Sequence, residues 1–207
     1  MPDKQQAHGG TPDTAARLDD PALAARLRAG EPAALELVVQ AYLPQLLRAA
    51  RGAGLDPSQA EDVTQATFTT FIETASRFEG RSHVRTWLFG ILYRKMSERW
   101  RGTARDREMD SLDDVMEHRF DADGSWSRPQ QTADTRVYAR EIKAHLTTCL
   151  DELNPAQRHA FLLREVQEFT TSEICKILDV TTTNLGVMLY RARNHLRECL
   201  AAAGVRT

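Results

Sequence analysis

The sequence has few cysteines and no long hydrophobic run, and each absence excludes a class of protein. The cysteines, Cys149, Cys175 and Cys199, form an odd and widely spaced set, which argues against a disulfide framework. No apolar run approaches the roughly 20 residues that span a bilayer, and the polar N-terminus lacks the apolar core of a signal peptide. We therefore expect a protein that does not insert into a membrane and that stays in the cytoplasm.

Catalytic motifs are missing as well. The sequence contains no glycine-rich phosphate loop, no nucleophile elbow and no convincing pair of carboxylates. We therefore expect neither an enzyme nor a cofactor. Strand-like alternation of apolar and polar residues does not persist anywhere, whereas apolar residues recur at helical spacing along most of the chain. These patterns predict an all-α fold.

The charges are distributed unevenly, although the formal net charge is only -2. Basic residues dominate from Arg77 to Arg107, and acidic residues dominate from Asp106 to Asp123. A second basic cluster near the C-terminus consists of Arg191, Arg193 and Arg197. Because the two signs are separated along the chain, the sequence indicates two basic modules joined by an acidic segment.

Helical periodicity and turn signals divide the chain into successive parts. Residues 1–18 are rich in Gly, Pro, Gln and Asp, which predicts a disordered lead. Residues 19–102 predict a first small helical domain, and residues 136–202 predict a second one. Between them, residues 103–135 carry the acidic run together with Gly124 and Pro129, which predicts a flexible acidic linker.

One helix of the first domain has an apolar stripe and a polar stripe. We expect Ser58 to cap this helix, which runs to about Ser76. The apolar stripe, predicted to be buried, consists of Val63, Thr67, Phe68, Phe71, Ile72 and Ala75. The opposite stripe, predicted to be exposed, consists of Asp62, Gln65, Thr69 and Glu73. Taken alone, this polar stripe is a solvated surface.

The second domain contains the pattern of a helix-turn-helix. A short helix, capped by Thr171 or Ser172, runs to Leu178, and a second helix begins after Thr181 or Thr182. This geometry places the first residues of the second helix near base edges in the major groove of DNA. Its buried stripe is predicted to be Leu185, Leu189, Ala192 and Leu196. The alternative is a helical hairpin with solvated charges.

Two parts of the chain, in this order, resemble the extracytoplasmic-function (ECF) sigma factors of the sigma-70 family. Ala60–Phe68, Phe78–Ser82 and Arg85–Leu88 resemble their region 2, and the stretch from Leu153 to Arg193 resembles their region 4. The resemblance covers about residues 23–101 and 142–200. It implies an alternative-sigma transcription initiation factor that binds core RNA polymerase and directs it to promoters by recognising -10 and -35 elements.

The resemblance assigns a role to the polar stripe of the first domain. It implies that Asp62, Gln65 and Thr69 dock on the clamp helices of the largest polymerase subunit. The family commonly has Glu after this Gln, whereas this chain has Ala66. The resemblance also implies a contact of the second domain with the beta flap of the polymerase, a monomer when free, and an anti-sigma factor as a partner.

The resemblance places recognition of the -10 element in the loop before the next helix and on one face of that helix. The implied residues are Arg81, Ser82, His83, Arg85, Thr86, Trp87, Tyr93, Arg94 and Arg101. Aromatic rings can stack on unpaired bases, at about 1–3 kcal/mol for each base, while arginines hold phosphates. A core position is an equally good interpretation of Trp87, and the family commonly has Asn where Arg94 stands.

The resemblance places recognition of the -35 element on the helix-turn-helix. The implied residues are Thr171, Thr183, Asn184, Gly186, Val187, Tyr190, Arg191 and Arg193. Asn can bind adenine through two hydrogen bonds, Thr and Val can contact a thymine methyl group, and Arg neutralises phosphates. Many members of the family have Lys or Arg where Gly186 and Met188 stand, so base reading is expected to shift towards Asn184, Val187 and Tyr190.

Two alternatives to a sigma factor follow from the residues. The first is a conventional helix-turn-helix regulator, which binds duplex DNA alone and usually as a dimer. The second is a metal sensor, because His145 and Cys149 lie four residues apart, as do His195 and Cys199. Residues at this spacing share a helix face, so the two pairs could form a tetrahedral zinc site if their helices meet.

Overall fold

The computed structural model describes residues 18, 20, 22–103 and 144–205, and all regular structure within them is helical. The predicted all-α fold is therefore confirmed. Almost all of the predicted linker, and residues 1–17 of the predicted lead, lie outside the described residues. Among those residues, no helix is long and apolar enough to cross a membrane.

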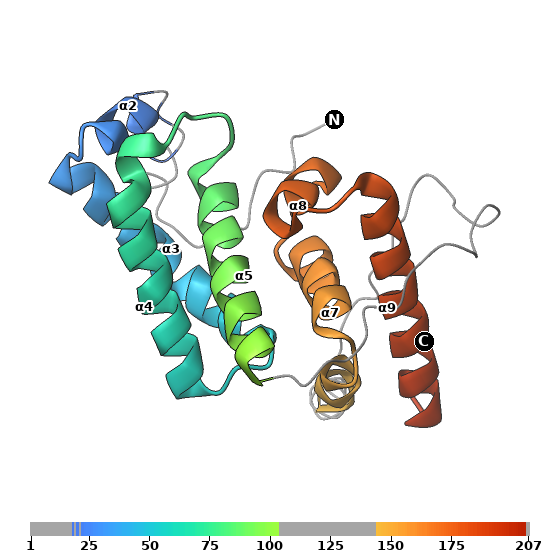
Figure 1. The fold of residues 1–207 in the computed structure, drawn as a ribbon. Coiled ribbons are helices and arrows are strands. Elements are labelled where there is room, and N and C mark those ends of the chain that lie inside the picture. Colours follow the sequence, from blue (N-terminus) through green and yellow to red (C-terminus); the bar gives the residue numbers. More distant parts are fainter. Residues whose placement is uncertain (1–17, 19, 21, 104–143, 206–207) are drawn as a thin grey trace, which may run out of the picture.

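The N-terminal module consists of α2 (Leu23–Arg28), α3 (Pro32–Gly52), α4 (Pro57–Thr74), the short 3-10 helix η1 (Ala75–Arg77) and α5 (Val84–Thr103). Helices α3, α4 and α5 pack against one another, and α2 lies against α3 and η1 (Figure 1). Their buried faces carry large apolar side chains such as Leu46, Phe71 and Leu88. Burial of these side chains supplies the main driving force for the fold of this module.

Helix α4 begins two residues earlier than its sequence suggests. Asp56, not Ser58, is the N-cap: its side chain accepts a hydrogen bond from the Gln59 amide, and the Gln59 side chain accepts one from the Asp56 amide. Pro57 follows at the first helical position, where its missing N–H costs nothing. The predicted cap was wrong because the Asp–Pro pair starts the helix before Ser58.

The predicted burial of Ile72 was also wrong. Val63, Thr67 and Phe71 are buried on α4, whereas the Ile72 residue is 50% exposed. Successive residues of an α-helix are rotated by about 100°, so Ile72 lies beyond the edge of the face centred on Phe71. An exposed apolar side chain therefore stands at the side of the polar stripe.

The C-terminal module consists of a helix over residues 144–151, α7 (Pro155–Phe161), the π-helical turn η2 (Leu162–Val166), α8 (Thr171–Leu178) and α9 (Thr182–Ala202). The caps show why these helices begin where they do. Asn154 caps α7, Thr170 forms a capping box with Glu173 on α8, and Thr181 caps α9. The cap of α8 was expected at Thr171 or Ser172, whereas the observed cap, Thr170, lies one or two residues earlier.

The turn between α8 and α9 matches the predicted helix-turn-helix. Asp179 adopts a left-handed conformation with φ of 55°, which ends α8 and redirects the chain. The predicted apolar stripe of α9 is confirmed, because Leu185, Leu189, Ala192 and Leu196 are all buried.

The two modules share one hydrophobic core in the structure. Phe89 and Leu92 of α5 belong to the same buried cluster as Phe169, Ile174 and Ile177 of the C-terminal module. Figure 1 shows α5 beside α7 and α8. A second, smaller buried cluster lies within the C-terminal module and consists of Cys149, Leu153, Ala192 and Leu196. The modules therefore contact each other directly.

A disulfide links Cys149 to Cys199, contrary to the expectation from cysteine number and spacing. The two cysteines are 50 residues apart in sequence, and their Cα atoms are 5.8 Å apart. The helix over residues 144–151 lies against the C-terminal half of α9, and this packing brings the two sulfur atoms together. Tertiary packing of this kind leaves no mark on sequence spacing. Cys175 is free.

Candidate nucleic-acid interface

The first turn of α5 joins the two modules through polar contacts. An Nη2 group of Arg85 donates a hydrogen bond to the Gln167 carbonyl at 2.7 Å, and its guanidinium lies 4.1 Å from the centroid of the Phe169 ring. Burial lowers the pKa of Arg85. The Thr86 hydroxyl donates to Oε1 of Glu173 at 2.9 Å. Arg85 and Thr86, both predicted to contact -10 DNA, therefore contact the C-terminal module here.

Glu173 serves both a helix cap and the contact between modules. Burial raises the pKa of Glu173, but hydrogen bonds from the Thr170 amide, the Thr170 hydroxyl and the Thr86 hydroxyl outweigh burial and lower it overall. The nearby positive charge of Arg85 acts in the same direction. A carboxylate held in its charged form keeps its acceptor capacity for Thr86.

Aromatic residues of α5 enclose His159 of α7 in the same interface. The rings of Tyr93 and Trp100 lie 5.1 Å and 4.8 Å from the imidazole centroid. Burial lowers the pKa of His159 to about 4, so the imidazole is neutral at neutral pH. Its Nδ1 donates a hydrogen bond to the Pro155 carbonyl, and Nε2 has no hydrogen-bond partner among the residues that the structure describes. Tyr93, another predicted -10 residue, is therefore partly covered by the C-terminal module.

Arg158 of α7 makes a further contact between the modules, at the C-terminal end of α3. Its Nε donates to the Gly52 carbonyl of α3 at 3.0 Å, and its Nη1 donates to Asp151. The turn after α3 accommodates this guanidinium because Gly54 has no side chain: a Cβ there would lie 2.9 Å from Nη1 of Arg158. Residue 158 is 8% exposed.

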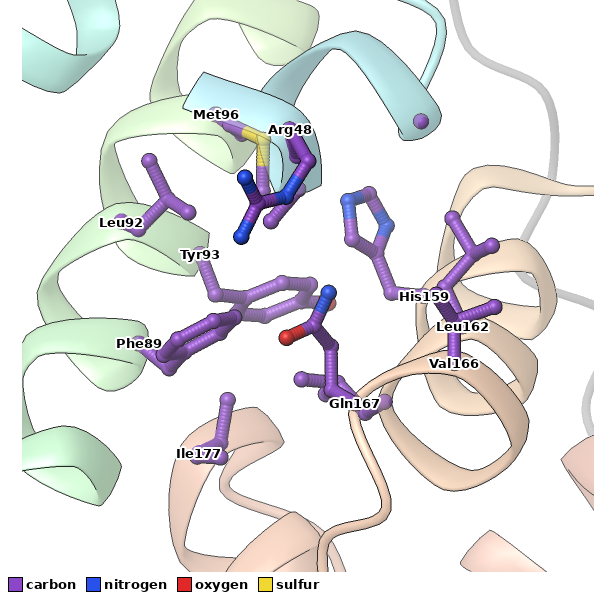
Figure 2. A pocket seen from close by; sticks show the side chains of 13 residues that line it. Arg48, Phe89, Leu92, Tyr93, Met96, His159, Leu162, Val166, Gln167 and Ile177 are labelled. Atoms are coloured by element: carbon purple, nitrogen blue, oxygen red, sulfur yellow. The ribbon is translucent and has the colours of Figure 1, made fainter. Parts of the chain in front are cut away.

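A small, partly open cavity lies between the modules. Its walls are mostly apolar and come from α3, α5, α7, η2 and α8. Figure 2 shows Arg48 and His159 on opposite sides, with Phe89 and Tyr93 along the wall formed by α5. The cavity is part of the interface between the modules.

Several of the predicted -10 residues remain accessible. Arg81 and His83 are exposed in the loop before α5, and Arg81 forms an ion pair with Glu79. Arg94 is exposed on α5 and donates from Nε to the Gly90 carbonyl at 3.1 Å. Ser82 is partly exposed. The interface between the modules therefore leaves part of the predicted -10 set exposed. The backbone of Arg101 lies in α5, and its side chain lies outside the described part of the chain.

Trp87 is partly exposed and packs against the core of the N-terminal module. Its ring stacks on Phe78 with centroids 4.8 Å apart and meets the edge of Phe71 at 5.5 Å. These contacts fix the orientation of the indole. Trp87 therefore has the packing expected of a core residue. It is also partly exposed, as a contact with -10 DNA would require.

The polar stripe of α4 is exposed as predicted and is longer than predicted. Asp62, Gln65 and Thr69 all face solvent, and Nη1 of Arg99 lies 3.9 Å from Oδ2 of Asp62. Ile72 continues the same stripe, since spacings of three and four residues place side chains on one helix face. Ile72 was predicted to be buried and is instead a surface residue. Its position three residues after Thr69 was the signal that could have identified it.

The predicted -35 residues lie on one side of the helix-turn-helix. Thr183, Asn184 and Arg191 are exposed on α9, and the partly exposed residues of this set are Thr171, Gly186, Val187, Tyr190 and Arg193. The Thr171 hydroxyl accepts a hydrogen bond from Arg164 at 2.6 Å. Arg193 donates to Glu165 at 2.7 Å, and this pair ties α9 to η2. The N-terminal half of α9 thus presents Asn, Thr and Arg side chains together.

The two His–Cys pairs that suggested a metal sensor as an alternative meet through a disulfide. Cys149 and Cys199 are bonded to each other, so neither sulfur is available as a thiolate ligand. Nε2 of His195 lies 3.3 Å from Oε2 of Glu152. In the described ranges, no group of three or more His, Cys, Asp or Glu residues could hold a metal ion.

Comparison with known proteins identifies the family of the chain. Residues 38–106 match the family Sigma-70 region 2, and residues 144–196 match the family Sigma-70, region 4. A probable RNA polymerase sigma factor of Haemophilus influenzae is 31% identical over 174 residues, which cover 80% of this chain and 89% of that protein. The ECF RNA polymerase sigma-E factor of the same species is 25% identical, with coverage of 86% and 94%.

Solved structures show the same fold. CnrH, in complex with the cytosolic domain of CnrY, has a TM-score of 0.62 at 23% identity, covering 87% of this chain and 96% of that chain. RpoE of Bartonella quintana, in complex with the anti-sigma factor NepR, has a TM-score of 0.55 at 24% identity, covering 80% and 96%. With both family regions matched in order, the chain belongs to the ECF sigma factors of the sigma-70 family, alternative sigma factors that serve promoter recognition and transcription initiation.

Proposed function

We propose that this sigma factor binds core RNA polymerase through the exposed stripe of α4, captures -10 DNA with α5 and the loop before it, and reads -35 DNA with α9. The observation that carries this proposal is the exposure of the α4 stripe in a chain whose second module presents a helix-turn-helix. The protein acts by binding alone, without catalysis, and it acts in the cytoplasm, where polymerase and promoter are found.

Polymerase binding by α4 is supported by the chemistry of its stripe. Asp62, Gln65 and Thr69 supply hydrogen-bonding groups, and Ile72 supplies an exposed apolar side chain on the same face. An apolar residue surrounded by polar ones is typical of a protein interface. The docking site for the clamp helices of the largest subunit then includes Ile72, and the beta flap is the contact of the C-terminal module.

A pair of matched variants tests this docking site. Ile72→Asp places a charge on the α4 stripe, whereas Leu43→Asp places the same charge at an exposed apolar residue of α3. We expect Ile72→Asp to weaken binding to core polymerase at least tenfold, because an unpaired carboxylate would be buried at the interface. Leu43→Asp is expected to bind as wild type does. Equal binding by both variants in a pull-down with core enzyme would place the docking site elsewhere.

Recognition of the -10 element requires the two modules to separate. In the structure the two modules pack against each other, and we call this the closed arrangement. Arg85, Thr86 and Tyr93 contact the C-terminal module in it. These side chains become available to melted DNA only when α7 and α8 leave α5. Binding to polymerase supplies the free energy for this change if polymerase binds the open form more tightly than the closed one.

We also propose that an anti-sigma factor controls this chain. Support comes from the RpoE structure of Bartonella quintana, in which a sigma factor of the same fold is bound to an anti-sigma factor. The interface between the modules already covers several of the proposed DNA-binding residues. An inhibitor that favours the closed arrangement therefore does not have to contact each of them itself. The free protein is a monomer in this account.

The match to region 2 argues against a ligand-sensing helix-turn-helix regulator, because such a regulator has no need of a polymerase-docking helix. The two functions differ in a simple measurement. A sigma factor supports transcription from a defined start site only together with core polymerase. A conventional regulator binds duplex DNA tightly by itself, usually as a dimer.

A further inference from the structure

The Cys149–Cys199 bond links the two ends of the C-terminal module. It joins the first described helix of the C-terminal module, residues 144–151, to the C-terminal half of α9. The fully buried members of the surrounding cluster are Cys149, Leu153, Ala192 and Leu196, and five partly buried residues pack against them: Leu146, Leu150, Phe161, Cys199 and Leu200. The cluster is smaller than the main core, so a cross-link that constrains the unfolded chain adds to the packing that holds these two helices together.

Helix α9 connects this cluster to the predicted DNA-reading surface. Leu185 and Leu189 in its N-terminal half pack in the large core, whereas Ala192 and Leu196 pack in the small one. Asn184 and Arg191 lie on the same continuous helix. Loss of order around the cysteines therefore removes support from the half of α9 that follows the DNA-reading residues.

The two cysteine residues differ in exposure. Cys149 is 1% exposed, whereas Cys199 is partly exposed near the end of α9. A small reagent therefore meets Cys199 first, and Cys149 is held beside it as the second thiol. Cys175 on α8 belongs to neither helix of the pair and is free. This third cysteine provides a control within the same chain.

We propose that Cys149 and Cys199 form a reversible thiol–disulfide site that sets the stability of the C-terminal module. The inference rests on the proposed function in one respect: a cytoplasmic sigma factor works where thiols are kept reduced and where disulfides form mainly as transient or redox-sensing bonds. The reduced form is then the resting form. The disulfide form, with its more stable module, accumulates under oxidation.

Glutathione disulfide is the class of oxidant that fits this site. The Cys199 thiolate attacks one of its sulfur atoms, which forms a mixed disulfide and releases one glutathione thiolate. The Cys149 thiolate then attacks the Cys199 sulfur, forms the Cys149–Cys199 bond and releases the second glutathione thiolate. The protein gives up two electrons, and its two thiol protons pass through water to the two glutathione thiolates.

Thermal unfolding of the full chain in each redox state tests the proposal. The protein is equilibrated with glutathione disulfide or with reduced glutathione, the disulfide is mapped by mass spectrometry, and the melting temperature is measured. From the loop that the bond closes, we expect the oxidised protein to melt about 10 °C higher than the reduced one. Hydrogen exchange is expected to slow mainly in residues 144–151 and 192–202, and to change little in α3 and α4.

Three variants make the result specific. Cys175→Ser is expected to keep the full shift in melting temperature, whereas Cys199→Ser and Cys149→Ala are each expected to abolish it. The proposal is overturned if glutathione disulfide leaves both thiols free, if oxidised and reduced wild type melt at the same temperature, or if the shift survives in Cys199→Ser. None of these measurements needs polymerase or DNA, so failure here is distinct from failure of the proposed function.

Discussion

Removing the guanidinium of Arg158 should open the contact between the modules without removing any residue assigned to DNA. Arg158→Met keeps most of the side-chain stem, and with it most of the packing, but loses the hydrogen bond from Nε to the Gly52 carbonyl. Because the donor is charged and the residue is 8% exposed, this bond is worth about 1.5–3 kcal/mol. The ratio of open to closed molecules should therefore rise by about 10- to 150-fold.

Single-molecule energy transfer measures this ratio directly. Labels introduced through unnatural amino acids at the exposed positions Arg77 and Glu198 report the distance between the modules. Arg164→Met is the matched control, because Arg164 bonds to Phe169 and Thr171 within the C-terminal module. An unchanged ratio in Arg158→Met, or an equal change in both variants, would show that the Arg158 guanidinium does not hold the modules together.

The remaining predictions concern pH and DNA. The pKa of His159 is about 4 in the fold and 6.5 in the unfolded chain, so acid protonates the unfolded chain first. Below about pH 6.5 the unfolded chain binds a proton that the buried imidazole of the folded chain does not bind. The free energy of unfolding therefore falls between about pH 6.5 and 4, by about 3 kcal/mol in total. Chemical denaturation across this range should show the loss in wild type and not in His159→Gln. Asn184→Ala should cost about 1–3 kcal/mol on the preferred -35 duplex and relax the preference at one base pair, as binding to a set of single-base variants would show. Arg191→Ala should weaken binding to all duplexes alike and lower the slope of log affinity against log salt by about 1; a change confined to one sequence would contradict the phosphate role.

Local features of the fold were predictable from sequence because they depend on neighbours along the chain. The buried stripe of α9 follows from apolar residues at helical spacing, and the turn between α8 and α9 follows from the residues around Asp179. The predicted positions of the helix caps were less accurate than the predicted helices. Asp56 and Thr170 each precede the expected cap, because a capping box depends on a side chain three residues further on as well as on the cap itself.

Features that depend on packing between distant segments were not predictable. The Cys149–Cys199 bond and the contact of Arg158 with Gly52 join residues that are 50 and 106 positions apart. Arg85 and Thr86 show the same limit at the candidate site. Their residue types suit DNA, and their contacts with Gln167 and Glu173 become visible only when both modules are placed. Sequence patterns therefore predict candidate surfaces, and the structure shows which of these residues lie between the two modules.

Transcription in vitro shows whether this chain directs start-site selection and whether it does so through the α4 stripe. Core polymerase is mixed with the wild-type chain, with Ile72→Asp or with Leu43→Asp, on DNA that carries the upstream region of its own gene, and transcripts are mapped to single-nucleotide resolution. We expect a defined start site with wild type and Leu43→Asp, and at least a tenfold loss of transcript with Ile72→Asp. No start-site-specific transcript with wild type, although the chain binds core enzyme, would contradict the proposed function.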